Sequence, residues 1–226
     1  MEQKLKVIAR IHNDFNDKFG IPRQSGILKD MVSTIVFEPE YRREEAFRGI
    51  EGFSHLWLIW QFSESVLEKW SPTVRPPRLG GNRRVGVFAS RSPFRPNPLG
   101  LSCVRLVKFT PCSGEGPVLT VTGADLMNGT QIYDIKPYLP FTDKIEDAAS
   151  GFAGAIEKKA LDVVCPDYLL QKLPPEKRSV LKEILSEDPR PSYQNDDRIY
   201  GFCFAGKEIK FTVDSNIMTV VDIATK

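Results

Sequence analysis

Histidine and cysteine are scarce in this chain, which has two histidines and four cysteines among its 226 residues. The cysteines are far apart, without a Cys-x-x-Cys pair, and His12 and His55 are isolated from them. This spacing matches neither a usual zinc site nor a small disulfide scaffold. We therefore expect no metal, and we expect the cysteines to be free thiols in a reducing compartment.

Other common signatures are also missing. No run approaches the roughly 18 apolar residues of a membrane span, and the N-terminus lacks the pattern of a secretory signal. We expect a cytoplasmic protein without a membrane partner. The sequence has no Gly-x-Gly-x-x-Gly, no P-loop and no Gly-x-Ser-x-Gly, so dinucleotide-binding, P-loop and serine-hydrolase chemistry are unsupported. A composition of 41% apolar and 27% charged residues is typical of a globular protein.

Acidic residues are absent from one long segment. Between Lys69 and Gly114 the chain has nine of its 31 basic residues and none of its 29 acidic residues. Within it, Arg75 to Gly100 contains six Arg, no Lys, five Pro and four Gly. Such a stiff, arginine-rich segment favours an anionic partner such as phosphate, carboxylate or nucleic acid. Two alternatives stay open, namely arginines paired with acidic residues elsewhere and a rigid crossover that closes a barrel.

Strand patterns dominate the first 140 residues. Alternating or β-branched apolar runs predict about seven strands, whereas residues 42–47 predict only one or two helical turns. The predicted strands are residues 5–12, 26–37, 53–62, 85–90, 101–109, 118–123 and 131–137. Many strands without a long helix indicate an antiparallel barrel or sandwich.

The pattern changes after residue 141. Residues 142–154 are small, polar and partly acidic, which is typical of a linker. Beyond them the sequence predicts a strand at 159–165, helices at 167–173 and 175–186, and a three-stranded meander at 198–205, 207–213 and 216–223. We therefore expect a barrel domain at 1–141 and a small α+β domain at 155–226.

Five motifs together resemble the TrmO (TsaA-like, YaeB-like) family of tRNA methyltransferases. They are the block Arg75 to Gly100, Pro22-Arg23-Gln24, Phe53-Ser54-His55-Leu56-Trp57, the stretch Asp134 to Pro140, and Asp188-Pro-Arg-Pro-x-Tyr193. The resemblance covers almost the whole chain. It implies a single-sheet β-barrel enzyme, unrelated to the Rossmann methyltransferases. Such an enzyme uses S-adenosylmethionine to methylate N6 of the threonylcarbamoyl-modified adenosine beside the anticodon of threonine tRNA.

The resemblance also implies a homodimer and a set of residues around the methyl donor. These residues are Pro22, Arg23, Gln24, His55, Leu56, Arg91, Leu101, Asp125, Leu126, Met127 and Asn128. Arg91 suits the donor's carboxylate, and Asp125 suits ribose hydroxyls or the ammonium group. Asn128 departs from the family, where Asp is expected in many members, and this puts the contact at that position in doubt. Without the family, His55 is equally well a core histidine, and Trp57, Trp60 and Phe62 are better read as core than as a shelf for adenine.

Contacts with the RNA are predicted from residue chemistry. Asn97, in Pro-Asn-Pro, is a candidate for accepting a hydrogen bond from the reacting amino group, although the tripeptide is equally good loop chemistry. An anticodon loop presents bases that enter a pocket without melting of a duplex. Candidates for its phosphates and bases are Arg78, Arg83, Arg84, Arg95, Arg190 and Tyr193. For the last two, the alternative is that Asp188-Pro189 merely ends a helix at Ser186.

Two other functions remain compatible with these residues. One is a non-catalytic RNA-binding barrel that has lost the methyl donor. The other is an enzyme of this fold that acts on a different small anionic substrate. Binding of S-adenosylmethionine separates the first from an enzyme, and binding of tRNA separates the second.

Overall fold

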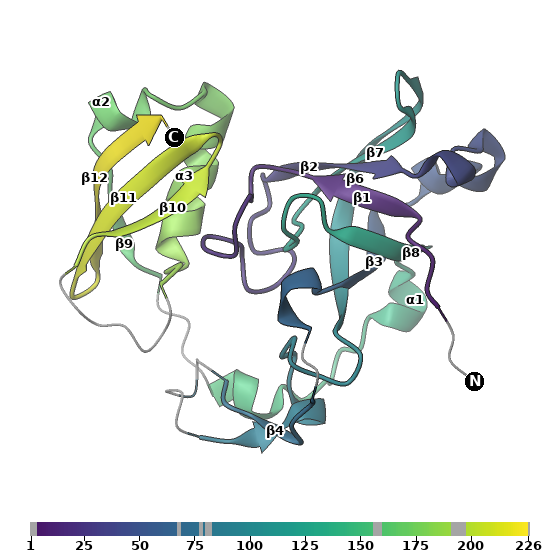
Figure 1. The fold of residues 1–226 in the computed structure, drawn as a ribbon, viewed down its shortest axis with the longest axis horizontal. Coiled ribbons are helices and arrows are strands. Elements are labelled where there is room, and N and C mark those ends of the chain that lie inside the picture. Colours follow the sequence, from purple (N-terminus) through teal and green to yellow (C-terminus); the bar gives the residue numbers. More distant parts are fainter. Residues whose placement is uncertain are drawn as a thin grey trace.

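The computed structural model describes residues 4–66, 69–76, 79, 83–155, 160–190 and 198–225. It contains a closed β-barrel from the first part of the chain and a four-stranded sheet with two helices from the last part (Figure 1). A two-stranded arm projects from the barrel at the bottom of the view. Among the described residues, no helix combines the length and the apolar character needed to cross a membrane.

Six antiparallel strands form the barrel, in the order β1-β2-β7-β6-β3-β8, and pairing of β1 with β8 closes it. The strands are β1 (Ala9–His12), β2 (Val32–Phe37), β3 (His55–Gln61), β6 (Leu99–Ser113), β7 (Gly116–Thr122) and β8 (Gln131–Pro137). Closure satisfies the hydrogen bonds that open strand edges would leave exposed. The predicted antiparallel barrel with a smaller α+β part is confirmed.

Alternation along the strands decides which side chains fill the barrel. In β3, Leu56, Leu58 and Trp60 are at most 5% exposed, whereas the residues between them face outward and are partly exposed. Apolar residues of the other strands complete the core, among them Ile11, Ile35, Leu119, Val121 and Ile132. Removal of this apolar surface from water is the main force that holds the barrel together.

Short 3-10 turns connect β2 to β3. They are η1 (Pro39–Tyr41), η2 (Glu44–Phe47) and η3 (Ile50–Gly52). The helical turn predicted at residues 42–47 corresponds to η2, whose Phe47 ring lies 4.6 Å from the ring of Phe37 and 5.3 Å from that of Phe109. This aromatic cluster extends the barrel core.

The arm leaves the barrel between β3 and β6, and its described residues are 63–66, 69–76, 79 and 83–98. Its described elements are η4 (Ser63–Ser65), β4 (Thr73–Val74), β5 (Val85–Gly86) and η6 (Val87–Ala89). The strand predicted at residues 85–90 is therefore wrong beyond Gly86. The hydroxyl and the backbone N–H of Ser90 both donate to the carbonyl of Val87, at 2.8 and 3.2 Å, and these bonds stabilise a turn.

The C-terminal unit pairs a sheet with two helices. The predicted meander is confirmed as β10 (Tyr200–Phe204), β11 (Lys207–Asp214) and β12 (Ile217–Thr225), and β9 (Asp162–Val164) adds to it parallel to β12. The helices are α2 (Asp167–Leu170) and α3 (Pro175–Ser186). Four side chains on one face of α3 are buried in the same apolar cluster as the sheet, namely Val180, Leu181, Ile184 and Leu185.

The connection between β1 and β2 belongs to the core of this C-terminal unit. Phe15, Leu28 and Met31 are at most 1% exposed and lie in the same apolar cluster as the C-terminal sheet and α3. At Gly20, where φ is +94°, a Cβ atom would lie 2.5 Å from the ring of Phe202. Only glycine permits this close approach. The barrel and the C-terminal unit therefore share a packed interface.

The chain crosses between the two units through residues that are mostly exposed. The segment predicted as a linker, residues 142–154, includes the end of α1 (Pro140–Asp143) and most of η7 (Gly151–Ala155). Within it only Phe152 is partly buried. The closed barrel ends at Pro137 and the C-terminal sheet begins at Asp162.

Candidate functional site

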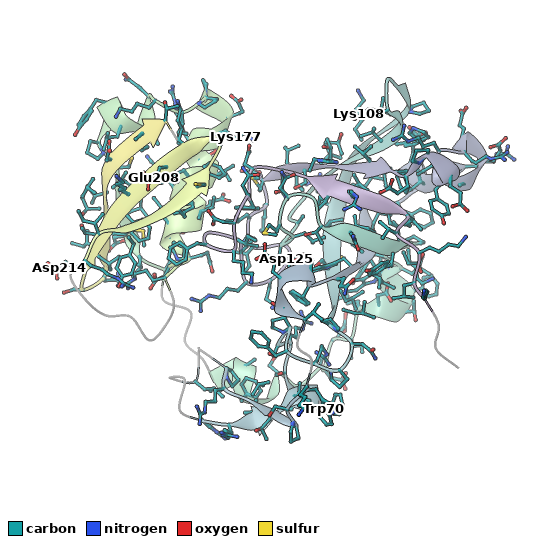
Figure 2. The ribbon with its side chains drawn as sticks, viewed as in Figure 1. Trp70, Lys108, Asp125, Lys177, Glu208 and Asp214 are labelled. Atoms are coloured by element: carbon teal, nitrogen blue, oxygen red, sulfur yellow. The ribbon has the colours of Figure 1, made fainter. Side chains whose placement is uncertain are left out.

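A partly buried carboxylate, that of Asp125, lies where β7 runs into the connection to β8. The Trp60 indole donates to the Ser102 hydroxyl at 2.9 Å, and that hydroxyl donates to Asp125 at 2.5 Å. Gly100 allows this arrangement, because a Cβ atom there would lie 2.2 Å from the Trp60 ring. In the view of Figure 2, Asp125 lies toward the C-terminal unit.

The environment of Asp125 opposes its negative charge. Burial raises the pKa of its carboxyl above the ordinary 3.8, while the Ser102 hydrogen bond, the charge of Arg91 and the backbone N–H of Ser25 act in the opposite direction. A group that brings hydrogen-bond donors or positive charge to this carboxylate would compensate for its burial. Such donors are characteristic of ribose and of an amino-acid ammonium group.

A loop from the β1–β2 connection lies beside this carboxylate. Gln24 accepts from the Arg91 guanidinium at 2.5 Å, and its own amide donates to the Arg23 carbonyl at 2.5 Å. The Ser25 hydroxyl accepts from the backbone N–H of Cys103 in β6 at 3.2 Å. The structure thus brings together Arg23, Gln24, Arg91 and Asp125, which come from three separate segments of the sequence.

The C-terminal unit supports the same loop. The Arg23 guanidinium donates to the backbone carbonyl of Arg190 at 2.9 Å and to that of Asp188 at 3.4 Å. Asp188 has φ +51° and its N–H donates to the Leu185 carbonyl at 3.1 Å, so it terminates α3. This agrees with the alternative that the Asp-Pro pair ends the helix.

Arg190, a predicted RNA contact, forms an ion pair within the C-terminal unit. Its guanidinium pairs with both carboxylate oxygens of Asp188, at 2.9 and 3.0 Å, and lies 5.7 Å from the centre of the Tyr200 ring. Only 8% of the residue is exposed. A buried bidentate pair makes Arg190 part of the fold, and contact with a phosphate would require that pair to open.

Asn128 holds the start of the β1–β2 connection. Its side-chain carbonyl accepts from the backbone N–H of Asn13 at 3.2 Å, and its amide donates to the Asn16 side chain at 3.0 Å. An aspartate would accept the first bond but has no hydrogen to donate in the second. The departure from the expected Asp therefore has a structural explanation in this chain.

Three predicted donor contacts, Pro22, Leu56 and Leu126, are buried. The side chains of Leu56 and Leu126 are at most 1% exposed and pack inside the barrel. A contact of Leu56 or Leu126 with the donor would therefore have to come from the backbone. Met127 is partly buried. Leu101, by contrast, is 58% exposed on the outer face of β6.

His55 lies on the outside of β3. Its ring contacts the Ser54 hydroxyl at 2.9 Å and lies 6.2 Å from the Tyr138 ring. The interpretation of His55 as a core histidine is therefore wrong, because alternation along β3 puts Leu56 inside. Trp57 also faces outward and donates to Asp143 at 3.0 Å. Of the other two predicted core aromatics, Trp60 fills the barrel and the partly buried Phe62 packs against the core, with its ring centre 4.2 Å from that of Trp60.

Asn97 and three of the arginines predicted to contact RNA lie on the arm. Asn97 is exposed in the turn before β6, and this turn is anchored by bonds from Leu99 N–H to the Asn97 carbonyl (2.7 Å) and from Phe62 N–H to the Pro98 carbonyl (2.8 Å). Arg83 and Arg84 are exposed, whereas Arg95 is partly buried and donates to the Ser90 carbonyl at 3.2 Å. Arg78 and Tyr193 lie outside the described residues.

Ser102 and Ser25 were not predicted from the sequence. For Ser102 a signal exists, because the alternation Gly100, Ser102, Val104 in β6 places a polar residue at an inward position. No such signal exists for Ser25, whose bond to β6 depends on how the loop packs. In the parts of the chain that the structure describes, no group of three His, Cys, Asp or Glu side chains is placed to hold a metal.

Comparisons with known proteins agree over both units. Residues 10–144 match the family model described as the tRNA-methyltransferase O N-terminal domain, and residues 159–226 match the TrmO C-terminal domain. A tRNA (adenine(37)-N6)-methyltransferase of Escherichia coli K12 is 40% identical over 193 residues, covering 83% of this chain and 82% of that protein. A putative S-adenosylmethionine-dependent methyltransferase of Pseudomonas aeruginosa PAO1 is 37% identical over 210 residues, covering 89% of this chain and 88% of that protein.

A solved structure is also similar. The crystal structure of TrmO from Pseudomonas aeruginosa superposes with a TM-score of 0.76 and 28% identity, over 99% of this chain and 100% of that one. The predicted resemblance is thus confirmed by sequence and by structure.

Proposed function

This chain belongs to the TrmO family, and we propose that it is a methyltransferase that uses S-adenosylmethionine to methylate N6 of adenine 37 in tRNA, the activity that its E. coli relative's name states. The observation that carries the proposal is the joining of Asp125, Arg91 and the Pro22 to Ser25 loop in one place. We further propose that the target adenosine carries a threonylcarbamoyl group and that the tRNA is a threonine tRNA. The cytoplasm is then the compartment that we expect.

The chemistry of these side chains fits S-adenosylmethionine. The donor has hydroxyl and ammonium hydrogens that suit the Asp125 carboxylate, and a carboxylate that suits the Arg91 guanidinium. When bound, it supplies an electrophilic methyl group on a positively charged sulfur. Gln24 holds Arg91 through its side-chain carbonyl, so the guanidinium is already oriented before any ligand arrives. Preorganisation of this kind lowers the entropy cost of binding.

Positioning is the main task of the protein in such a reaction. The adenine amino nitrogen attacks the methyl carbon in line with the bond that breaks, and it loses a proton as the product forms. We propose that the Asn97 side-chain carbonyl accepts a hydrogen bond from that amino group. Its place supports this role, because the turn that carries it is tied to Phe62 at the end of β3 and leads directly into β6.

We assign recognition of the RNA backbone to the arginines of the arm. Arg83 and Arg84 are exposed, and Arg84 donates to the Thr73 hydroxyl at 3.2 Å across the β4–β5 pair. Their charge is not offset by neighbours in the chain, since residues 69–114 include no Asp or Glu. These guanidinium groups therefore suit phosphates of an anticodon loop.

A homodimer is the assembly that we propose. The outer face of β3 and β6 carries exposed Leu101, and α1 lies beside that face because Trp57 in β3 bonds to Asp143. Phe141 of α1 is 86% exposed and Ile145, just beyond it, is 67% exposed. An apolar surface of this kind is typical of a protein interface. Replacement of Phe141 by Arg should shift the molar mass measured by light scattering toward that of a monomer.

One experiment tests whether the protein methylates tRNA, which atom receives the methyl group and whether threonylcarbamoylation must come first. The protein is incubated with donor labelled in its methyl group and with threonine tRNA prepared with and without threonylcarbamoylation, and the nucleosides are then analysed. We expect label on N6 of the modified adenosine. Label on unmodified adenosine would show that threonylcarbamoylation is not required. No label, together with donor binding undetectable by calorimetry, would replace the proposal with a non-catalytic RNA-binding protein.

A further inference from the structure

Two large aromatic side chains are exposed together on the arm. Trp70 is 51% exposed and Phe88 is 74% exposed, and their ring centres lie 6.2 Å apart with an interplanar angle of 33°. Figure 2 labels Trp70 at the end of the arm, away from the barrel. Aromatic rings are usually buried, so an exposed pair that packs against itself indicates a contact surface.

The backbone around this pair is fixed by the arm itself. In the β4–β5 pair, Thr73 lies opposite Gly86, and the N–H of Val87 donates to the Pro72 carbonyl at 3.0 Å. Val87 is 1% exposed, so it anchors the turn that carries Phe88. Because Trp70 precedes β4 and Phe88 follows β5, the strand pairing sets the separation of the two rings. A preset surface loses little entropy when it binds.

The charge around the rings is positive. Arg84 reaches Thr73 across the same strand pair, and Arg83 and Arg75 are also exposed. No Asp or Glu occurs from residue 69 to residue 114. Aromatic rings beside arginines are the combination with which proteins hold single-stranded nucleic acid, since the rings stack on bases and the cations follow the phosphates.

The pair also lies close to the methyl-donor residues along the chain. Phe88 and Arg91 are separated by three residue steps, which span at most about 11 Å of backbone. A base on the rings would therefore be near a nucleotide that enters the site beside Arg91. This places the rings within reach of a neighbour of the target adenosine.

We propose that Trp70 and Phe88 form a stacking platform for an unpaired base next to the target adenosine in the anticodon loop. The proposal rests on the proposed function and names a substrate contact of the same site. A second copy of this chain is the other occupant that an exposed aromatic pair suits, but the excess of arginine around the rings favours a polyanion over an identical, equally basic surface.

The test measures binding of the full chain to a threonine tRNA transcript, with S-adenosylhomocysteine present. Trp70→Ala should raise the dissociation constant by roughly 5- to 100-fold, the range expected for loss of one base stacked on an aromatic ring. Trp70→Phe should stay within about 3-fold of the wild type, because it keeps a ring. Tyr168→Ala, which removes a ring that is 67% exposed on α2, is the matched control and should have no effect.

Salt dependence separates stacking from charge. Trp70→Ala should leave the slope of log Kd against log salt unchanged, whereas Arg84→Ala should reduce it by about 0.7, as expected for one phosphate contact to a single strand. If the Trp70→Ala and Tyr168→Ala proteins bind tRNA with the same affinity, the proposed platform is wrong. So would a change in molar mass by light scattering with tRNA affinity intact, which would make the rings a protein interface.

The proposed function is judged separately. If the wild type binds and methylates tRNA while Trp70→Ala does both equally well, the platform alone is wrong. If the wild type neither binds nor methylates tRNA, the proposed function fails and the platform fails with it.

Discussion

Substitution of Gly100 by Ala should destabilise the barrel and disturb Asp125 together. The added Cβ would lie 2.2, 2.4 and 2.7 Å from three atoms of the Trp60 ring, so this ring, which is only 5% exposed, has to move. Overpacking of a core costs about 1–3 kcal/mol. Displacement of the ring also removes the 2.9 Å bond from its indole to Ser102, which is about 1 kcal/mol more.

We therefore expect Gly100→Ala to lower the free energy of unfolding by about 2–4 kcal/mol, a large fraction of the 5–15 kcal/mol typical of proteins. Urea denaturation followed by circular dichroism measures this loss. Binding of S-adenosylmethionine, measured by calorimetry, should weaken as well, because Ser102 orients Asp125.

A matched control and a compensating variant sharpen the test. Gly52→Ala places its Cβ in open space and should change the free energy of unfolding by less than about 0.5 kcal/mol. Adding Trp60→Phe to Gly100→Ala should relieve the overlap, so the double variant should be less unstable than the sum of its parts. If Gly100→Ala unfolds at the same urea concentration as Gly52→Ala, the proposed packing of Trp60 on Gly100 is refuted.

Four further outcomes follow from the site. Because burial raises the pKa of Asp125, the contribution of this carboxyl to the free energy of unfolding is largest at low pH and is lost as the pH rises above its ordinary pKa of 3.8. Asp125→Asn should therefore gain stability relative to the wild type as the pH rises, measured by urea titration at each pH, and a difference that does not change with pH would contradict this. Asn97→Ala should slow single-turnover methylation at saturating tRNA without weakening donor binding, and an unchanged rate would exclude its role at N6. Replacing Arg83 and Arg84 together by Ala should weaken tRNA binding and flatten its salt dependence, so an unaltered slope would argue against phosphate contacts. Arg23→Ala should weaken donor binding measured by calorimetry, since it releases the loop from the C-terminal unit; a wild-type dissociation constant would show that this tether is dispensable.

Local patterns were sufficient for most of the secondary structure. The predicted strand at residues 131–137 and the helix at residues 175–186 match β8 and α3 residue for residue. Both depend on near neighbours, since alternation makes a strand and Pro175 begins a helix. The strand predicted at residues 85–90 is wrong beyond Gly86, because bonds from Ser90 to the Val87 carbonyl turn the chain there.

The functional site likewise contains residues that the sequence identifies and contacts that only packing decides. The family resemblance identified Arg91 and Asp125, whose chemistry follows from residue type. The partners of these residues depend on register and packing: β6 brings Ser102 to Asp125, and the loop that carries Gln24 reaches Arg91 while its flanking residues pack into the C-terminal core. Such pairings lie far apart in the sequence, and no local pattern specifies them.

The sequence by itself determined that this chain is a β-rich protein with one acid-free arginine segment and the motifs of a single family. Only the tertiary structure decided that Arg190 is paired inside the fold and that Leu56 points inward. It also decided that Trp70 and Phe88 share an exposed surface. The physical reason is that composition and alternation act over a few residues, whereas burial and ion pairing are set when distant segments meet.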